Sequence, residues 1–266
     1  MGSARHGLAR VLSKLGWCSR SVAFGLIHAG RVRVNGIVCR DPERPTDPER
    51  DAIQVEDERV AAVEWVYLML NKPRGLVTTT RDEKGRRTVY ECLSGPPWSS
   101  NETGKEALSA ASGTSKEPGV NLRGVMPVGR LDQASEGLLL FTNDTTWAAH
   151  LTDPNSGVPK TYHVQIDRLP DAGFLERMQE GVVEGGERLE ADAVAILRTG
   201  QRNAWLEVTL AEGRNRHLRR MIRALGSEVL RLVRVRVGDC DLGLLPKARY
   251  RLLTPEEVQR LATARA

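Results

Sequence analysis

A carboxylate stands two residues after an arginine in the segment that begins at Gly129, and this pair is the first candidate for chemistry in the chain. Arg130 and Asp132 lie in a polar turn, and the apolar run Leu138–Phe141 that follows predicts a buried strand. Such a strand can hold one carboxylate rigidly, and a neighbouring cation keeps it ionised, as a covalent nucleophile requires. Spacing alone favours a plain structural ion pair between Arg130 and Asp132.

A second carboxylate, Glu136, follows Asp132 by four residues and suggests the acid pair of a glycosidase. That chemistry needs the two carboxyl groups roughly 5 to 9.5 Å apart across a sugar. We instead expect Glu136 to face solvent from a loop or to pair with an arginine. The five histidines are scattered, and no C-x-x-C pair joins the cysteines, so no metal site is expected.

The whole segment Gly129–Asp144 resembles the G-R-L-D-x-x-[ST]-x-G-L-L-x-[LF]-T-N-[DN] signature of the pseudouridine synthases that modify ribosomal RNA. The resemblance implies that Asp132 is the catalytic aspartate and that Arg130 is its ion-pair partner. Ser135 and Glu136 stand where other members carry Thr and a small residue.

A tyrosine in a strand-like segment is the next candidate. Lys160-Thr161-Tyr162-His163-Val164 resembles the K-x-Y-x-V strand of the same family, which implies that Tyr162 lies against the target base. Its ring can stack on uracil, and its hydroxyl can relay a proton. Periodicity alone would favour an ordinary core tyrosine.

A helix with one apolar and one basic face is expected after the alternating strand 205–210. The apolar stripe is Leu218, Met221, Ile222 and Leu225, and the stripe of arginines about 200° around the helix is Arg216, Arg219, Arg220 and Arg223. A row of guanidinium groups suits phosphate, so RNA contacts are predicted for Arg214, Arg216, Arg220 and Arg223. Arg231, Arg234 and Arg236 are expected to extend this basic surface.

The same segment, from Glu212 to Met221, resembles the E-G-x-x-x-x-[VIL]-[RK]-R-[ML] motif of the synthase family. By that resemblance Leu218 lines the base pocket, and Arg219 is the basic residue near the catalytic aspartate.

The N-terminal residues predict two short helices and a hairpin. Ser19 can cap the second helix, Gly16 and Gly30 can end the two helices, and Asn35-Gly36 is a two-residue hairpin turn. The first forty residues hold seven basic side chains and no acidic one. This unit resembles the S4 RNA-binding domain, and phosphate contacts are expected from Arg10, Lys14, Arg20, Arg31 and Arg33.

Composition and charge distribution indicate the class of protein and of partner. The 266 residues carry a net charge of +5, and a basic N-terminus followed by eight acidic side chains between Asp41 and Glu58 indicates a face for a polyanion. Without a signal-like segment or an apolar run long enough for a membrane, we expect a cytoplasmic protein with no membrane partner.

The two resemblances together imply an α+β fold, with an S4-like domain at 1–62 and a synthase domain with a mixed, largely antiparallel sheet at 63–258. The Ser-, Gly- and Pro-rich stretch 94–122 is expected to be a flexible insertion. The reaction that the resemblance implies is isomerisation of a ribosomal uridine to pseudouridine without a cofactor. We expect a monomer that binds ribosomal RNA or a ribosome-assembly intermediate.

Three alternatives stay open. They are a target in small-subunit rather than large-subunit RNA, a non-catalytic RNA-binding assembly factor, and another RNA-modifying enzyme such as a methyltransferase. No Gly-rich cofactor turn follows a strand, which disfavours the last. Attack by Asp132 on the ribose and attack on the base are both compatible with the assignment.

Overall fold

A computed structural model describes residues 6–61, 64–80, 82–98 and 120–264 of the chain. The chain divides into two compact units. The first comprises residues 1–67, 119–126 and 141–148, and the second comprises residues 68–118, 127–140 and 149–266. Within the described ranges, no helix is both long enough and apolar enough to cross a membrane.

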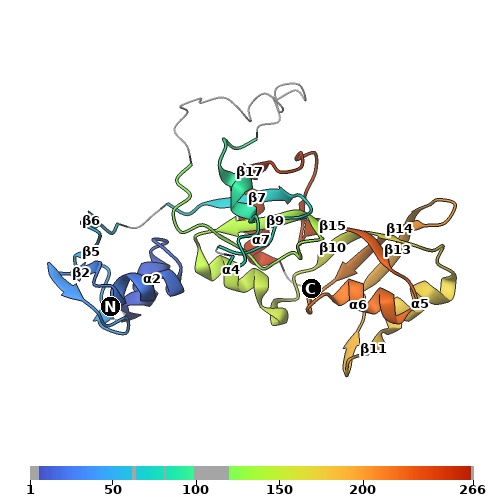
Figure 1. Ribbon diagram of the computed structural model, residues 1–266, viewed down its shortest axis with the longest axis horizontal. Helices are drawn as coiled ribbons and strands as arrows, with labels where there is room; N and C mark the ends of the chain where they lie inside the picture. The colour runs from blue at the N-terminus through green and yellow to red at the C-terminus, as the bar shows by residue number, and fades with distance from the viewer. Residues whose placement is uncertain (1–5, 62–63, 81, 99–119, 265–266) are drawn as a thin grey trace. The chain divides into compact units, whose positions relative to one another are not determined.

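The N-terminal residues of the first unit form two helices and a small antiparallel sheet (Figure 1). The helices are α1 (Leu8–Lys14) and α2 (Arg20–His28), and the sheet has the order β3-β2-β5-β6. Its strands are β2 (Val32–Val34), β3 (Ile37–Cys39), β5 (Ile53–Val55) and β6 (Glu58–Arg59), while β1 (His6–Gly7) pairs with β4 (Pro45–Thr46). This helix–helix–hairpin order confirms the predicted arrangement.

Local sequence explains these elements. The hydroxyl of Ser19 accepts a hydrogen bond from the amide of Val22 at 3.2 Å and caps α2, as expected. Asn35 and Gly36 both have positive φ, +54° and +79°, which suits the two-residue turn between β2 and β3. The apolar faces of the helices and strands then form one core, which includes Leu8, Leu12, Ile27, Val32 and Val55.

The second large element is a nine-stranded sheet with the order β13-β14-β10-β15-β9-β7-β17, to which β16 and β8 add at β15 and β9. Its strands are β7 (Tyr67–Lys72), β8 (Met126–Pro127), β9 (Glu136–Thr142), β10 (Lys160–Ile166), β13 (Ala193–Thr199), β14 (Ala204–Leu210), β15 (Val229–Val237), β16 (Cys240–Asp241) and β17 (Tyr250–Leu252). β15 and β9 run parallel, whereas the ladders β13–β14, β14–β10, β10–β15, β15–β16 and β7–β17 are antiparallel. The predicted mixed, largely antiparallel sheet is confirmed.

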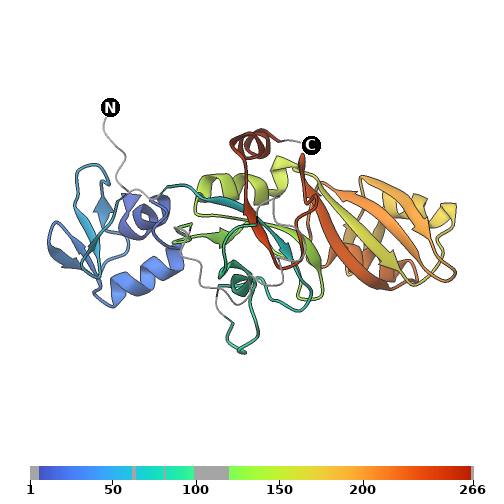
Figure 2. The same cartoon turned by 90° about the horizontal axis from the view of Figure 1, so that it is seen from above.

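Helices pack on one face of this sheet, as Figures 1 and 2 show for α5 and α6. Phe174 and Met178 of α5, with Leu218, Met221 and Ile222 of α6, form a core with the buried residues of β10 and β14. The helices are α4 (Thr145–Thr152), α5 (Ala172–Glu180), α6 (His217–Ala224) and α7 (Pro255–Thr263), with short 3-10 turns η1 (Val89–Leu93) and η3 (Pro154–Ser156). A hairpin, β11 (Val182–Glu184) with β12 (Glu187–Leu189), follows α5.

Most of the insertion expected at 94–122 lies outside the described residues, since 99–119 are not described. Its first residues are held in place. The hydroxyl of Tyr250 donates to the carbonyl of Gly95, and the amide of Trp98 donates to the carbonyl of Tyr250, both at 2.7 Å. Residues 95–98 are thus tied to β17.

Candidate active site

The turn that carries Asp132 is held through its main-chain oxygens. The ammonium of Lys72, which is fully buried, donates to the carbonyl oxygen of Asp132 at 3.1 Å and to that of Ser135 at 2.8 Å. The hydroxyl of Thr78 donates to the carbonyl of Leu131 at 2.8 Å. Burial lowers the pKa of Lys72 to about 8. The backbone of Asp132 is therefore fixed from the core, and its carboxylate remains available for other contacts.

At Gly137, β9 lies so close to β15 that only glycine fits. Its φ is +99°, and a Cβ placed there would lie 2.2 Å from the carbonyl oxygen of Arg234. Any other residue would need both an unfavourable backbone conformation and a displacement of β15. Gly137 thereby permits the parallel pairing that begins immediately after the Asp132 turn.

The carboxylate of Asp132 is about one third exposed and lies between two arginines. Its Oδ2 is 3.6 Å from Nη1 of Arg216 and 3.9 Å from Nε of Arg219. In the described part of the chain no group donates a hydrogen bond to either carboxylate oxygen. The carboxylate is stabilised as an anion while its lone pairs stay free, which is the state a nucleophile needs.

The structure differs from the expected Arg130–Asp132 ion pair. Arg130 is exposed, and no ion pair joins it to Asp132 among the described residues. The partners come instead from Arg216 and Arg219, more than eighty positions later in the chain. Spacing identified the arginine nearest to Asp132 in the sequence, whereas the arginines nearest to it in space come from the start of α6.

Arg219 is the more rigid of these two partners. Its side chain is 12 % exposed, and its Nη atoms donate to the carbonyls of Ala134 at 3.2 Å and Val229 at 3.4 Å. Burial and the neighbouring Arg216 lower the pKa of Arg219, whereas Asp132 acts in the opposite direction. Its Nε has no hydrogen-bond partner and is the atom nearest to Asp132.

A pocket of about 320 Å³ opens beside Asp132. It brings together six residues that the sequence singled out: Arg130, Asp132, Tyr162, Arg214, Arg216 and Arg219. Leu218 also lines it and is almost fully buried. A pocket with an aromatic ring, an apolar wall, a carboxylate and several cations suits a planar base attached to a phosphate chain.

Glu136 does not form a carboxylate pair with Asp132 in this pocket. It lies in β9 and is 4 % exposed, so the expectation of a solvent-facing loop residue is wrong. Nε of Arg231 donates to its Oε1 at 2.7 Å, and Nζ of Lys247 donates to its Oε2 at 2.5 Å, so the alternative expectation of an arginine partner is confirmed. Burial works to raise the pKa of Glu136, but these hydrogen bonds outweigh it and hold the pKa below its usual value.

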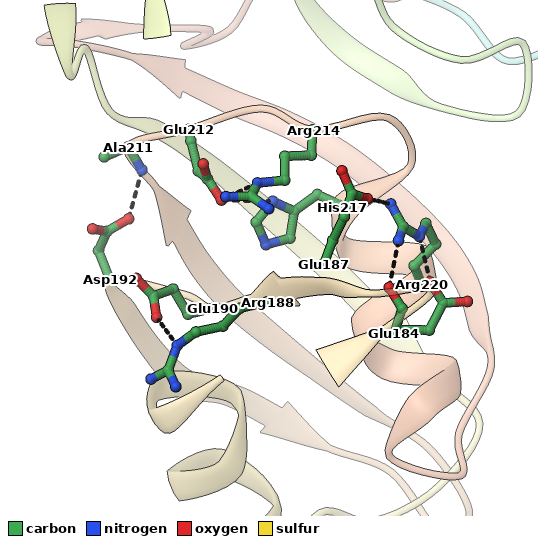
Figure 3. Close-up of polar contacts among 10 residues, drawn as sticks. All are labelled: Glu184, Glu187, Arg188, Glu190, Asp192, Ala211, Glu212, Arg214, His217 and Arg220. Atoms are coloured by element: carbon green, nitrogen blue, oxygen red, sulfur yellow. Dashed lines mark hydrogen bonds and ion pairs between the residues drawn. The ribbon is translucent and has the colours of Figure 1, made fainter. Parts of the chain in front are cut away.

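The arginine stripe of α6 is divided between two tasks. Arg216 and Arg219 face Asp132, but Arg220 is held by the β11–β12 hairpin (Figure 3). Its Nε donates to Oε2 of Glu184 at 2.6 Å, and its Nη1 pairs with Glu187. Arg220 is therefore neutralised within the protein, and the uniform row of cations expected on this helix is not present.

The loop before α6 is anchored at several points, also visible in Figure 3. The amide of Ala211 donates to Asp192, and Arg214 pairs with Glu212 at 2.8 Å. The ring of His217 is buried, its Nδ1 lies 3.8 Å from Oε1 of Glu212, and burial lowers its pKa. The loop is thus a fixed platform for Arg216 rather than a loose chain.

Other arginines expected on the basic surface also have partners within the protein. Arg234 is buried and donates to the carbonyl of Leu138 at 2.8 Å, Arg231 pairs with Glu136, and Arg236 pairs with Asp241 at 2.6 Å. Arg223 lies 3.5 Å from Glu228. The expectation that Arg234 extends an exposed surface is wrong, because its guanidinium bonds the strand that follows Asp132.

The basic residues of the N-terminal unit remain on its surface. Arg10, Lys14, Arg20, Arg31 and Arg33 are all exposed. Arg20 pairs with Glu43 at 3.4 Å and Arg31 pairs with Glu56, whereas Arg10 and Arg33 have no acidic partner among the described residues. Arg10 and Arg33 are thus available to a polyanion, as is Lys14, which contacts His6.

Sequence reasoning missed Lys72, Lys247 and His217. A signal existed for Lys72, because a lysine at the end of the apolar strand Tyr67–Lys72 must either break the strand or be buried with partners. No signal identified Lys247, whose contact with Glu136 joins residues 111 positions apart. In the ranges that the structure covers, no group of three or more His, Cys, Asp or Glu is placed to hold a metal.

Comparison with known protein families identifies both parts of the chain. Residues 66–224 match the family model described as RNA pseudouridylate synthase, and residues 7–50 match the S4 domain. The chain is 32% identical over 256 residues to ribosomal large subunit pseudouridine synthase B of Bacillus subtilis (strain 168), covering 96% of this chain and 94% of that protein. It is equally similar, 32% over 256 residues, to an uncharacterized RNA pseudouridine synthase of Aquifex aeolicus (strain VF5), covering 96% and 93%.

A solved structure is similar to this chain over nearly its whole length. A crystal structure of a pseudouridylate synthase superimposes with a TM-score of 0.60 at 27% identity, covering 96% of this chain and 99% of the other. The similarity thus extends over both the N-terminal unit and the sheet that carries Asp132.

Proposed function

The chain belongs to the RNA pseudouridylate synthase family, and from this premise we propose that it converts one uridine of large-subunit ribosomal RNA to pseudouridine with Asp132 as the nucleophile. The choice of ribosomal RNA and of the large subunit rests on the name of the Bacillus subtilis relative. The S4 domain matched at residues 7–50 supports a structured RNA as the substrate.

One observation carries the assignment of Asp132. Its carboxylate is the acid at the pocket that combines partial exposure, two cations within 4 Å and no hydrogen bond from the described chain. Cations stabilise the anion without occupying its lone pairs at bonding distance. Glu212, the other acid lining this pocket, is already paired with Arg214 at 2.8 Å.

The reaction proceeds from a uridine that has left the RNA fold, because a base held in a helix cannot enter a pocket. Asp132 attacks, and the bond between N1 of the base and C1′ of the ribose breaks. The detached uracil turns within the pocket and C5 bonds to C1′, while the bond between the Asp132 carboxylate and the substrate breaks and returns the free aspartate. The proton on C5 leaves, and N1 gains a proton. Attack on the ribose and attack on the base both use the same carboxylate.

Other lining residues have roles that follow from their chemistry. Tyr162 offers a ring face to uracil and a hydroxyl that can relay the C5 proton. Leu218 provides an apolar wall, and Arg219 holds the carboxylate from the buried side. All bonds in the isomerisation are exchanged within one nucleotide, so the proposed reaction needs no cofactor.

The first test is to map pseudouridine in ribosomal RNA from cells that lack the gene. One site should disappear and should return with the wild-type gene but not with Asp132→Asn. The matched control is Glu176→Gln, which removes an exposed carboxylate of α5 and should restore the site. A site lost in small-subunit RNA would move the target to that subunit.

Two further outcomes are informative. If no site changes, unmodified ribosomal RNA transcribed in vitro and labelled with tritium at uridine C5 is incubated with the purified protein. Absence of tritium release, together with tight RNA binding, would favour a non-catalytic assembly factor. Full activity of Asp132→Asn would remove the nucleophile assignment while leaving the enzyme class intact.

A further inference from the structure

Two cations approach a single oxygen atom in the pocket. Nη1 of Arg216 and Nε of Arg219 lie 3.6 and 3.9 Å from Oδ2 of Asp132, and both distances exceed those of a charged hydrogen bond. Asp132 is therefore shared between the two guanidinium groups and bonded tightly by neither. A small movement toward one of them would convert a loose ion pair into a hydrogen-bonded one.

The two arginines differ in their freedom. Arg219 is 12 % exposed and its Nη atoms are bonded to main-chain carbonyls. Arg216 is 45 % exposed, and in the described part of the chain its guanidinium makes no hydrogen bond. An exposed ion pair at this distance contributes little, so Arg216 can leave Asp132 at small cost.

The backbone directs Arg216 toward the pocket. This residue has φ +51° and ψ +32°, a left-handed conformation that is costly for a residue with a Cβ. It occupies the N-cap position of α6 but provides no side-chain cap. The N-cap residue therefore adds no side-chain hydrogen bond to the helix, and its guanidinium lies beside the carboxylate of Asp132 instead.

The surroundings of Arg216 favour a bound anion. The uncapped start of α6 carries partial positive charge. The buried hydroxyl of Ser135 lines the same pocket, and among the described residues neither this hydroxyl nor Nε of Arg219 has a hydrogen-bond partner. These groups offer donors for oxygen atoms that the protein itself does not supply.

We propose that Arg216 exchanges Asp132 for a phosphodiester group of the substrate, next to the target uridine. In the free protein Arg216 pairs with Asp132. When the RNA phosphate binds Arg216, Asp132 closes onto the free Nε of Arg219, and its other oxygen is left open for attack. This inference rests on the proposed function, and it makes phosphate binding the event that moves Asp132 from two loose ion pairs to one hydrogen bond with Arg219.

The exchange predicts that Arg216 affects RNA binding more than the chemical step, which kinetics can measure. Loss of the Arg216 guanidinium removes a phosphate contact. In that variant Asp132 pairs with Arg219 alone, as it does in the proposed RNA-bound state. Arg216→Ala should therefore raise KM for RNA about tenfold, as expected for one lost charged hydrogen bond, with kcat within about threefold of wild type. The slope of log KM against log salt concentration should fall by about one.

The experiment uses the full chain with unmodified large-subunit RNA transcript labelled at uridine C5, across a series of KCl concentrations. Arg216→Gly removes the guanidinium but tolerates positive φ, so it should behave like Arg216→Ala. Arg216→Lys should recover part of the KM effect. Arg188→Gln, which removes an exposed cation of the β11–β12 hairpin, is the control and should match wild type.

Several outcomes would overturn the proposal. Full activity of Arg216→Gly beside a damaged Arg216→Ala would mean that only the backbone conformation matters. A large fall in kcat with unchanged KM and salt slope would mean that Arg216 acts on Asp132 alone. If the wild-type chain modifies no RNA, the proposed function fails, but filter binding of the same transcript still tests the phosphate contact through the salt slope.

Discussion

Lys72 and Asp132 lie 60 positions apart in the chain and are joined by a hydrogen bond of 3.1 Å from the Lys72 ammonium to the carbonyl oxygen of Asp132. The same ammonium reaches the carbonyls of Pro73 at 3.2 Å and Ser135 at 2.8 Å. A buried cation therefore holds the main chain at the proposed nucleophile and again three residues after it. The position of the carboxylate is determined by the core of the sheet and by arginines around the pocket together.

Replacement of Lys72 by Met should change how stability depends on pH. The folded pKa of Lys72 is about 8, below its ordinary value of 10.5. Between pH 8 and pH 10.5 the unfolded chain therefore binds more protons than the folded chain. The contribution of Lys72 to the free energy of unfolding consequently rises with pH in this range. The unfolding free energy of wild type minus that of Lys72→Met should increase by about 1 to 3 kcal/mol from pH 8 to pH 10.5. Denaturant unfolding at several pH values measures this difference, and parallel curves would contradict the buried ammonium.

Glu136→Gln should destabilise the protein at neutral pH. The carboxylate is buried and bonded by Arg231 and Lys247, so its loss leaves two cations without their anion. Because both cations are partly exposed, we expect about 1 to 3 kcal/mol. The folded pKa lies below the ordinary value of 4.5, so this stabilisation is present above pH 4.5 and is lost as pH falls through the folded pKa.

Urea unfolding at pH 7 and near pH 3 tests this prediction, with the exposed Glu176→Gln as the control. The difference between wild type and Glu136→Gln should be large at pH 7 and small at the lower pH. A difference that does not depend on pH would indicate that shape, rather than charge, sets the role of Glu136.

Arg220→Gln should affect folding more than RNA binding. Its guanidinium joins α6 to Glu184 and Glu187 of the β11–β12 hairpin (Figure 3), so it has no free donor face to offer phosphate. The melting temperature should fall, because the contact between α6 and the hairpin is lost, while the salt slope of RNA binding stays at the wild-type value. A reduced salt slope would return Arg220 to the phosphate-binding set.

The S4-domain match predicts that cations of the N-terminal unit contribute unequally to RNA affinity. Arg10 and Arg33 have no acidic partner among the described residues, whereas Arg31 pairs with Glu56. The double variant Arg10→Gln/Arg33→Gln should lower the salt slope by about 1.5 to 2, and Arg31→Gln should lower it less. Filter binding to ribosomal RNA transcript measures the slopes, and equal effects per residue would contradict the distinction.

Local patterns in the sequence predicted much of this structure. The cap at Ser19, the turn at Asn35-Gly36 and the buried strand after Asp132 each depend on residues close together in the chain, so spacing was sufficient. Such patterns could not predict which arginines have partners within the protein. Arg220, Arg231 and Arg234 all belong to a basic stretch, yet Glu184, Glu136 and the carbonyl of Leu138 engage them from distant elements.

The error at Arg130 has the same physical origin. A basic residue two positions from Asp132 is the nearest cation in the chain, but a polar turn can direct neighbouring side chains apart. The cations within 4 Å of the carboxylate come from a loop and helix that the sheet topology brings back to β9. Ion pairs depend on such contacts, which residue spacing does not encode.

The parallel ladder between β9 and β15 has a consequence for synthesis of the chain. Glu136 and Arg231 are 95 positions apart, so the strand beside Asp132 emerges from the ribosome long before the strand that pairs with it and before both arginines that face the carboxylate. Such distant pairing is slow, and one edge of the apolar strand β9, which also neighbours the earlier strand β7, stays unpaired until β15 is made. A growing chain thus carries Asp132 without its facing cations until Arg216 and Arg219 have been added, and a chain truncated before Arg216 would lack the proposed site.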